Sequence, residues 1–371
     1  MNDRPLTLTC SLADQVFAQA KSIGIYNLSL GLVCQLARRP EVARLTVLAN
    51  RTLTGHLPDS VDVRWHDLPA RGKLRRLWWD QWGAYSAAAA TGNEWLFLPK
   101  GFASFARRCP VKLSACVADT IHDFYREHHP GAVSGLEQQY FVRSFWGTVE
   151  NARVIFTISE FTTGEVLRLA KARGLAPPPV RTIGIGFDRP AAPPGPRDDR
   201  VVLIAAHCPR KRTGLLLDWT ARWQQDSGYQ GAVDCVGLLP RGVAFPSRSG
   251  WRWHDRLPEA EHRALIARAR ALVFMTEYEG FGMPPVEAAL AGACPVFSSI
   301  PATREVMGDC GCAFSNVDYE SFRRAMDGAL KTPVETVAGW GEQLLVRHDW
   351  AKVTDRLVRG LQEAQSGGTQ R

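Results

Sequence analysis

Short β-branched runs alternate with longer segments of helical period along most of the chain, and this alternation constrains the fold more than any other feature. The runs that we expect to be strands are Leu6–Cys10, Leu45–Ala49, Val61–Trp65, Trp95–Leu98, Lys112–Val117, Val154–Ile158, Val180–Ile185, Val201–Ala206, Val233–Val236, Ala271–Met275 and Cys294–Phe297. The expected helical segments include Leu28–Leu36, Glu165–Arg173, Glu259–Ala269, Pro285–Ala291 and Ser321–Leu330. Strands that alternate with helices predict a parallel sheet covered on both faces.

A proline-rich segment divides this alternation into two halves. Arg189–Arg200 reads RPAAPPGPRDDR, and its four prolines and one glycine are typical of a linker. We therefore predict the α/β fold class with two Rossmann-like, doubly wound domains facing a central cleft. The N-terminal domain would cover residues 1–188, the linker 189–200, the C-terminal domain 201–349, and a C-terminal helix and tail 350–371. A chain of 371 residues is long enough for two domains, and open α/β sheets bind ligands at the carboxyl ends of their strands.

Composition narrows the function classes. Hydrophobic residues make up 45% and charged residues 22%, as in ordinary globular proteins. The chain shows neither a signal peptide nor a membrane-spanning run, so we expect a cytoplasmic protein with free thiols on its nine cysteines. The net charge of +8 fits an anionic substrate or an anionic membrane. No nucleic-acid-binding motif accompanies the charge, so we expect no nucleic-acid partner.

The most informative stretch is Thr276–Val296, which reads TEYEGFGMPPVEAALAGACPV and joins a predicted strand to a predicted helix. Gly280 and Gly282 let a ligand approach the backbone, and amides at a helix N-terminus form an anion site. Glu279 and Glu287 stand on either side, and a carboxylate can accept hydrogen bonds from two hydroxyls. Two such carboxylates around an amide-lined turn suit a sugar nucleotide. The alternative is that both glutamates are solvated charges and the glycines only form a turn.

This stretch resembles family 4 of the retaining glycosyltransferases, which have the GT-B architecture. The family signature is two glutamates separated by seven residues around an EGFG-x-P core, and Glu279–Glu287 fits every position of it. The resemblance implies that Glu279 contacts the donor sugar, that Gly280, Phe281, Gly282 and Met283 contact the sugar and diphosphate, and that Glu287 binds the ribose. It also implies that the C-terminal domain binds the nucleotide sugar and that the N-terminal domain lies on the acceptor side.

A second segment of the C-terminal half adds cations. Val201–Leu217 reads as strand, loop and helix, with Arg210, Lys211 and Arg212 in the loop. Cations in this place can neutralise a diphosphate and stabilise it as a leaving group. Lys211 falls on the family's lysine, whereas the family's frequent strand-end arginine is replaced by Ala206. A solvated basic loop is the alternative.

Two segments of the N-terminal half also resemble family motifs. Lys21–Tyr26 is similar to the glycine-rich loop after the first strand, and Gly24 would approach the donor there. Asp119–Asp123 is similar to the family's HD motif, in which His122 would make a hydrogen bond to the donor sugar and Asp123 would orient the ring. We expect His128 and His129 to be loop residues.

The helix around Arg75–Trp82, RRLWWDQW, combines cations with tryptophans. This composition is found on membrane-surface helices, but we favour a helix with core-facing aromatic residues. An exposed helix would instead support docking to a lipid-linked acceptor, so a peripheral membrane contact stays open.

From these motifs we predict retaining, metal-independent transfer of a hexose-like unit to a hydroxyl acceptor. The catalytic candidates are Lys211, His122 and Glu279. The partners would be a nucleoside diphosphate sugar as donor substrate and a saccharide or lipid-linked acceptor, with no cofactor and no metal ligand. Three alternatives remain open. They are a non-catalytic sugar-nucleotide-binding protein, a nucleotide-sugar epimerase or phosphorylase of the same architecture, and a nucleic-acid binder suggested by charge alone.

Overall fold

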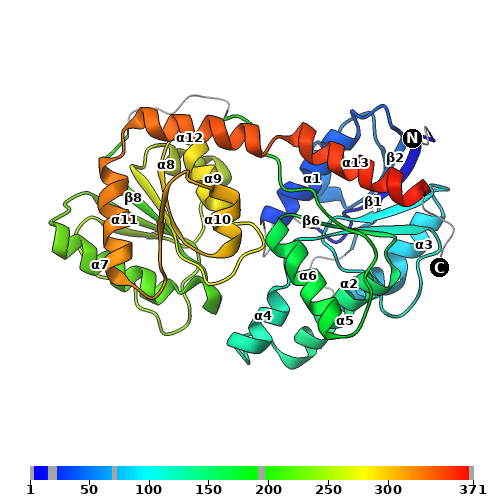
Figure 1. Cartoon of the computed structure of the whole chain (residues 1–371), viewed down its shortest axis with the longest axis horizontal. Coiled ribbons are helices and arrows are strands. Elements are labelled where there is room, and N and C mark those ends of the chain that lie inside the picture. The colour runs from blue at the N-terminus through cyan, green and yellow to red at the C-terminus, as the bar shows by residue number, and fades with distance from the viewer. Residues whose placement is uncertain (1–3, 16–22, 69–72, 191–196, 367–371) are drawn as a thin grey trace. The chain divides into compact units, whose positions relative to one another are not determined.

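The computed structural model describes residues 4–15, 23–68, 73–190 and 197–366 (Figure 1). Their contacts divide the chain into two compact units. Unit 1 comprises Met1–Asp123, Val133–Phe187 and His348–Arg371, and unit 2 comprises Phe124–Ala132 and Asp188–Arg347. Each unit is a parallel sheet between helices, and we describe each by itself.

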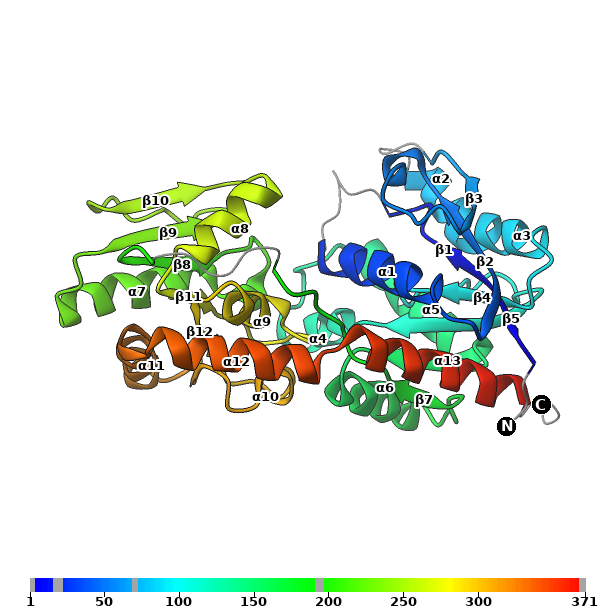
Figure 2. The ribbon, with the colours of Figure 1, turned by 90° about the horizontal axis from the view of Figure 1, so that it is seen from above.

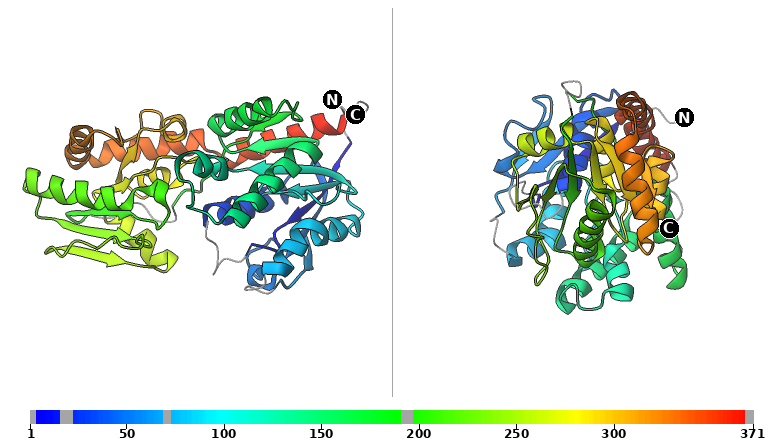
Figure 3. Two further views of the ribbon diagram at one scale, coloured as in Figure 1. Left: turned by 90° about the horizontal axis from the view of Figure 1, so that it is seen from below. Right: turned by 90° about the vertical axis from the view of Figure 1, so that its left-hand side faces the viewer.

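The described strands of unit 1 form one parallel sheet of seven, in the order β3-β2-β1-β4-β5-β6-β7. They are β1 (Leu6–Ser11), β2 (Val42–Ala49), β3 (Asp62–Trp65), β4 (Trp95–Leu98), β5 (Lys112–Val117), β6 (Val154–Thr157) and β7 (Val180–Thr182). Figure 3 shows these strands side by side. Chain order reverses between β1 and β4, which is the position where doubly wound sheets open a crevice at their carboxyl edge.

Most helices of unit 1 connect its strands. They are α1 (Ile23–Leu36), α2 (Lys73–Trp78), the π-helix η3 (Trp79–Gly83), α3 (Ala84–Ala89), α4 (Ile121–His128), α5 (Gly135–Asn151) and α6 (Glu160–Ala172), with a short 3-10 turn η2 (Arg51–Leu53). Two serines cap helices: the Ser134 hydroxyl accepts the Glu137 N–H in the first turn of α5, and the Ser159 hydroxyl accepts the Thr162 N–H in the first turn of α6. Helix α4 begins in unit 1, and its last residues belong to unit 2.

The C-terminal helix α13 (Trp350–Ser366), whose packing the sequence does not determine, belongs to unit 1 (Figure 2). It contacts α1 and β6. A Cβ added to Gly360 would stand 2.6 Å from the ring of Phe156, and one added to Gly31 would stand 2.3 Å from the ring of Trp350. Two glycines, Gly31 of α1 and Gly360 of α13 itself, therefore allow this helix to pack closely on unit 1.

The described strands of unit 2 form a parallel sheet of six, in the order β10-β9-β8-β11-β12-β13. They are β8 (Arg200–Ile204), β9 (Ala232–Val236), β10 (Trp251–His254), β11 (Ala271–Phe274), β12 (Cys294–Ser298) and β13 (Cys312–Phe314). The helices are η4 (Pro209–Lys211, 3-10), α7 (Thr213–Ser227), α8 (Glu259–Ala267), α9 (Met283–Leu290), α10 (Pro301–Met307), α11 (Tyr319–Lys331) and α12 (Val334–Arg347). Helix α11 packs against α7, and α12 packs against α9.

The predicted α/β fold class with two doubly wound units is confirmed. Every predicted strand is present, with ends that differ by up to three residues, and β7 has only half its predicted length. The predicted central cleft between domains stays a prediction. The proline-rich segment has residues 191–196 outside the described part of the chain. Within the described ranges, no helix combines the length and the apolar character that crossing a bilayer requires.

Candidate functional site

The sheet of unit 2 brings two motif segments together. Chain order reverses between β8 and β11, which pair directly, so the loops that follow these two strands meet at the carboxyl edge of the sheet. The loop after β8 carries Arg210 and Lys211, and the loop after β11 carries Glu279. A backbone hydrogen bond from Glu277 N–H to the Arg210 carbonyl, 2.7 Å long, joins the two loops.

The charged centre of the site is the Glu279 carboxylate with its two cations. Lys211 Nζ lies 2.7 Å from Glu279 Oε1, and Arg210 forms an ion pair with the same oxygen. The Thr276 hydroxyl donates to Oε1 as well, at 2.9 Å. Among the described residues, Oε2 of Glu279 takes part in no hydrogen bond, so this oxygen is available to a ligand hydroxyl.

Burial and charge together determine the protonation of this centre. Burial raises the pKa of Glu279, but the positive charges of Lys211 and Arg210 together lower it by more. The pKa of Glu279 therefore lies below its ordinary value. Burial lowers the pKa of Lys211 to about 8, against the opposing effect of Glu279. Near neutral pH the site therefore holds one carboxylate and two cations, a net positive charge suited to an anion.

Packing fixes the directions of the cations. Lys211 Nζ lies 3.7 Å from the centre of the Phe274 ring, a cation–π contact, and the residue is 8% exposed. Arg210 also donates to the Tyr278 carbonyl at 2.9 Å. Arg212 has φ +45°, the one non-glycine residue with positive φ in the described part of the chain. Such strain is characteristic of functional turns.

The turn before α9 has the geometry of an anion site. Gly282 has φ +91° and caps α9, and a Cβ there would stand 2.9 Å from Thr303 Cγ2. Gly280 and Phe281 are buried, and Met283 is the first residue of the helix. The N-terminus of α9 therefore points its dipole at the turn that also carries Glu279.

Glu287 lies in the second turn of α9. Burial raises the pKa of Glu287, Arg263 lowers it and Glu259 raises it, with a net upward shift. Within the described ranges its carboxylate makes no hydrogen bond and no ion pair. A partly buried carboxylate without a protein partner among the described residues suits hydroxyl donors of a ligand.

The structure does not bring an arginine to the end of β8, where Ala206 stands. Its backbone N–H and carbonyl both bond the Thr213 hydroxyl, at 3.1 and 2.7 Å. Arg210 instead supplies a guanidinium four residues later in the chain. The loop therefore holds two cations on Glu279 despite the departure from the family pattern.

A hollow of about 390 Å³ lies beside this centre. Its lining residues are Phe124, His128, His129, Arg212, Glu277, Asn316 and Val317, all of unit 2. His129 Nε2 lies 2.6 Å from Glu277 Oε2, and Phe124 stacks on Tyr278 with ring centres 4.7 Å apart. His129 is a loop residue as predicted, but the sequence does not indicate its pair with Glu277. The prediction of a loop at His128 is wrong, because His128 is the last residue of α4. The one signal in the sequence is that His129 directly follows a segment that contains His122 and His128.

The candidates of the N-terminal half lie in unit 1. His122 is in the first turn of α4, and its ring stacks on Phe141 with centres 4.0 Å apart. Burial lowers the pKa of His122 to about 4, and Glu137 opposes this shift, so the ring is neutral near pH 7. Its Nδ1 has no hydrogen-bond partner among the described residues. Asp123 lies 3.5 Å from Arg168.

The expected glycine loop of the N-terminal half differs from the structure. Helix α1 begins at Ile23, so Gly24 lies within its first turn instead of in a loop. The apolar residues from Ile23 onward continue the helix and bury Tyr26. Lys21 and Ser22 lie outside the described residues.

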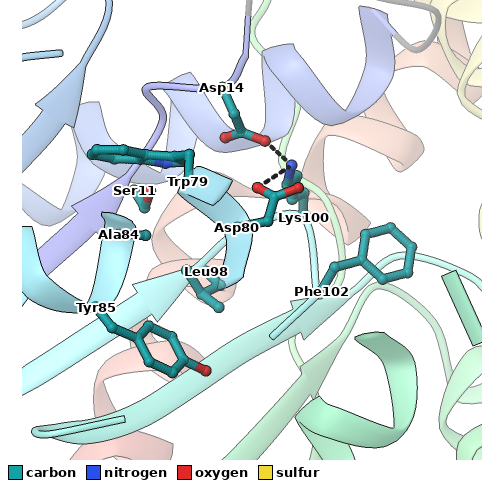
Figure 4. Close-up of a pocket in the computed structure, with 9 residues that line it drawn as sticks. All are labelled: Ser11, Asp14, Trp79, Asp80, Ala84, Tyr85, Leu98, Lys100 and Phe102. Carbon is teal, nitrogen blue, oxygen red and sulfur yellow. Dashed lines mark hydrogen bonds and ion pairs between the residues drawn. The ribbon is translucent and has the colours of Figure 1, made fainter. Parts of the chain in front are cut away.

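Unit 1 has its own charged cluster where its chain order reverses (Figure 4). Asp14 follows β1 and Lys100 follows β4, and the two form an ion pair. Lys100 lies 3.5 Å from Asp80, which accepts a 2.6 Å hydrogen bond from the Tyr140 hydroxyl. Burial lowers the pKa of Lys100 to about 8 and raises that of Asp80 to about 6, the latter against hydrogen bonding by Tyr140 and the charge of Arg76. The adjoining cavity of about 10 Å³ has room for one water molecule.

No group of three or more metal-binding side chains occurs among the residues that the structure describes. The predicted metal-independent chemistry stays a prediction.

Comparison with known proteins agrees with this architecture. A family model described as "Glycosyl transferases group 1" matches residues 249–344, which include the whole turn before α9. The O-antigen chain mannosyltransferase B of Escherichia coli is 29% identical over 241 residues, or 57% of this chain and 60% of that protein. The serotype-specific mannosyltransferase WbdA of Escherichia coli is 39% identical over 84 residues, which are 23% of this chain and 10% of that protein. The matches thus span only part of the length of these relatives.

Solved structures resemble the whole chain. The sucrose-phosphate synthase of Thermosynechococcus elongatus has a TM-score of 0.69 at 15% identity and covers 98% of this chain and 100% of that one. The Anabaena protein HepE in complex with UDP and glucose has a TM-score of 0.67 at 14% identity, covering 96% and 99%. At such identities the likeness concerns the fold, which is of the GT-B class.

Proposed function

We propose that this chain is a retaining glycosyltransferase of family 4 that moves a sugar from a nucleoside diphosphate sugar to a hydroxyl of a saccharide or lipid-linked acceptor. The observation that carries the proposal is the contact of Lys211 and Arg210 with Glu279 beside the N-terminus of α9. Cations and helix amides that converge on one buried point are suited to a diphosphate, and the carboxylate among them is suited to a sugar.

The chemistry follows from the charges. The diphosphate occupies the positive centre, where Lys211 and Arg210 neutralise the charge that develops on it as the bond between sugar C1 and phosphate oxygen breaks. The acceptor oxygen forms its bond to C1 on the same face, and its proton passes to the departing phosphate oxygen. Two cations supply the charge that a metal ion supplies in other enzymes, so we propose no required metal and no cofactor.

Two carboxylates position the donor. Glu279 Oε2 accepts a hydroxyl of the sugar, while Oε1 stays with Lys211 and Arg210. Glu287 accepts the ribose hydroxyls, since its carboxylate lacks a protein partner among the described residues. In this proposal Gly280–Met283 contact the sugar and diphosphate through their backbone.

Two residues of unit 1 complete the proposal. His122 is neutral near pH 7 because its pKa is low, so it makes an uncharged hydrogen bond to the donor sugar. Gly24 contributes backbone near the donor from the first turn of α1.

The relatives suggest the transferred sugar. Both matched Escherichia coli proteins are described as mannosyltransferases, one of them of an O-antigen chain. We therefore propose a mannosyl donor and a role in polysaccharide assembly.

A panel of nucleotide sugars tests this function. Thermal melting of the purified protein is measured with each nucleoside diphosphate sugar, because a ligand of the native state raises the melting temperature. Release of free nucleoside diphosphate is then followed with and without saccharide acceptors. We expect a mannosyl donor to raise the melting temperature. We also expect nucleoside diphosphate to be released only when an acceptor is present. Binding without release on any acceptor would identify a non-catalytic binding protein, and release that needs no acceptor would favour an epimerase or another activity.

A further inference from the structure

An apolar strip lies exposed on the helical segment of unit 1 that runs from α2 through η3 to α3. Leu74 is 81% exposed, Trp78 55% and Trp82 43%, and these residues follow one another at intervals of four. Leu77 adds a fourth side chain at 38%. Residues four apart lie on one side of a helix, so the strip is continuous along it.

This strip corrects the expectation of core-facing aromatic residues. Trp79 and Tyr85 are indeed buried, at 3% and 1% exposed, and they hold the segment on the sheet. Trp78 and Trp82 are exposed instead, and residues 74–78 of α2 are all exposed. Trp78 is nevertheless held in place, since a Cβ on Gly83 would stand 2.7 Å from its ring.

A neighbouring loop extends the apolar surface. The Gln81 side-chain oxygen accepts the N–H groups of Phe105, at 3.0 Å, and Ala106, at 3.3 Å. These bonds tie the loop to the helix next to Trp82, and Phe105 there is 42% exposed. We call Leu74, Leu77, Trp78, Trp82 and Phe105 the tryptophan surface.

Arginines accompany the tryptophan surface. Arg75 lies on the helix, Arg107 and Arg108 follow Phe105, and the Arg143 guanidinium lies 6.0 Å from the Phe105 ring. The Arg76 guanidinium instead donates to the Asp14 carbonyl at 2.8 Å. The carboxylate of this helical segment, Asp80, has a side chain only 12% exposed and pairs inward with Lys100. Arginines therefore lie near the apolar side chains in sequence, and the described part of this helical segment carries no exposed carboxylate.

We propose that the tryptophan surface docks this protein on a bilayer that carries anionic lipids. Tryptophan and leucine enter the boundary between headgroups and acyl chains, while arginines bind lipid phosphates. Charge complementarity favours this occupant over a second copy of the chain, which would place arginine against arginine.

The proposal does not depend on the glycosyltransferase assignment, although docking would bring the chain to a lipid-linked acceptor. Binding to the bilayer has an apolar contribution from two tryptophans and an electrostatic contribution from the arginines. Both can be removed without touching the donor site of unit 2.

Vesicle sedimentation tests the proposal. The full chain is mixed with vesicles of phosphatidylcholine alone or with 30 mol% phosphatidylglycerol, and the bound fraction is measured. We expect binding to the anionic vesicles that weakens with salt, and at least about tenfold weaker partition for Trp78→Ser/Trp82→Ser and for Arg75→Glu/Arg108→Glu. The matched controls are Trp253→Ser, at a residue 46% exposed in unit 2, and Arg324→Glu, whose side chain is 67% exposed.

The controls should bind vesicles like the unchanged protein, and all variants should keep its circular dichroism spectrum and its melting shift with donor. Equal binding to neutral and anionic vesicles, no binding to either, or unchanged binding of the double variants would each overturn the proposal. Dimerisation that the tryptophan substitutions abolish would overturn it in favour of a second copy. If the protein fails to bind vesicles as expected but the donor still raises its melting temperature, the proposed function is unaffected. If vesicle binding is as expected and the donor does not raise the melting temperature, the proposed function fails and the docking proposal stands.

Discussion

Lys211, Arg210 and Glu279 hold one another in charged form at the carboxyl edge of the unit 2 sheet. Each cation lies against the same carboxylate oxygen, and the Lys211 ammonium also contacts the Phe274 ring. Removing one of the three leaves the others buried with unbalanced charge, which costs more than an exposed ion pair would. Function and local stability are therefore coupled at this point.

Replacing Lys211 tests its part in turnover. Lys211→Ala should lower kcat by about 100-fold, because it removes charge stabilisation of the leaving diphosphate. Donor affinity should fall much less, since Arg210 and the α9 amides remain. Steady-state kinetics separate the two quantities, and Lys331→Ala, at an exposed lysine of α11, serves as the control. An unchanged kcat would remove Lys211 from the proposed mechanism.

The low pKa of Lys211 predicts a pH dependence. Its pKa is lowered to about 8, so the ammonium charge is present below that pH and is lost as pH rises through it. Turnover should therefore decline above about pH 8. Lys211→Arg should keep activity at higher pH, because a guanidinium stays protonated there. Lys100 also has a pKa lowered to about 8, so Lys100→Arg is the necessary control. If Lys100→Arg moves the pH at which turnover declines and Lys211→Arg does not, the assignment of this decline to Lys211 is wrong.

Glu287 should act on binding. Glu287→Gln removes a charged acceptor of ribose hydroxyls and should weaken donor affinity by about tenfold. Its raised pKa means that protonation begins at a higher pH than for an ordinary glutamate, so affinity should also decrease as pH falls through that range. Calorimetric titration with the donor measures both effects. Glu261→Gln on α8 is the control, and equal affinities for the two variants would argue against a ribose contact.

The motif spacing predicts which residues surround the donor turn, but not how they pair. Glu279, Lys211 and Arg210 are all identified from the sequence, whereas their sharing of one oxygen depends on the adjacency of β8 and β11. The contact of His129 with Glu277 joins residues that are 148 positions apart, and no local pattern encodes it.

At the scale of elements, α9 shows how one backbone position sets a site. The helix starts directly after a glycine with φ +91°, and two prolines follow in its first turn, where a missing N–H costs little. The turn can then approach α10 closely, because Gly282 has no Cβ to meet Thr303.

A pair of glycine substitutions measures this approach. Gly282→Ala and Gly131→Ala both place a side chain at nearly the same φ, +91° and +88°, but Gly131 has open space around its Cβ position. The shared conformational cost is about 1 kcal/mol. Crowding against Thr303 should add about 1–3 kcal/mol for Gly282 alone. Chemical denaturation gives both values, and equal losses would contradict the close contact.

Strands with continuous apolar runs were predictable, and the two edge strands of the unit 2 sheet were not. The unpredicted β10 reads WRWH, with Trp251 buried but Arg252 and Trp253 exposed, so it lacks an apolar run. The unpredicted β13 has only three residues. Helices α5 and α12 were also missed. The apolar residues of α5 are spaced among many polar ones, and Gly339 and Gly341 interrupt the pattern of α12, so tertiary packing selects the buried face of each helix.

At the scale of the whole molecule, each unit is a complete doubly wound domain with a charged cluster where its chain order reverses. Lys100 and Asp14 occupy that place in unit 1, as Lys211 and Glu279 do in unit 2. The last helix, α13, packs into unit 1, so the N-terminal domain depends on the C-terminal end of the chain for part of its core.

The configuration of the product tests the central claim most directly. The purified chain is incubated with a nucleoside diphosphate α-mannose and a saccharide acceptor, and the new linkage is assigned by NMR from the anomeric proton and carbon signals. We predict an α-linked mannosyl product that forms together with one free nucleoside diphosphate. A β-linked product, or consumption of the donor without a new glycosidic bond, would contradict retaining transfer at this site.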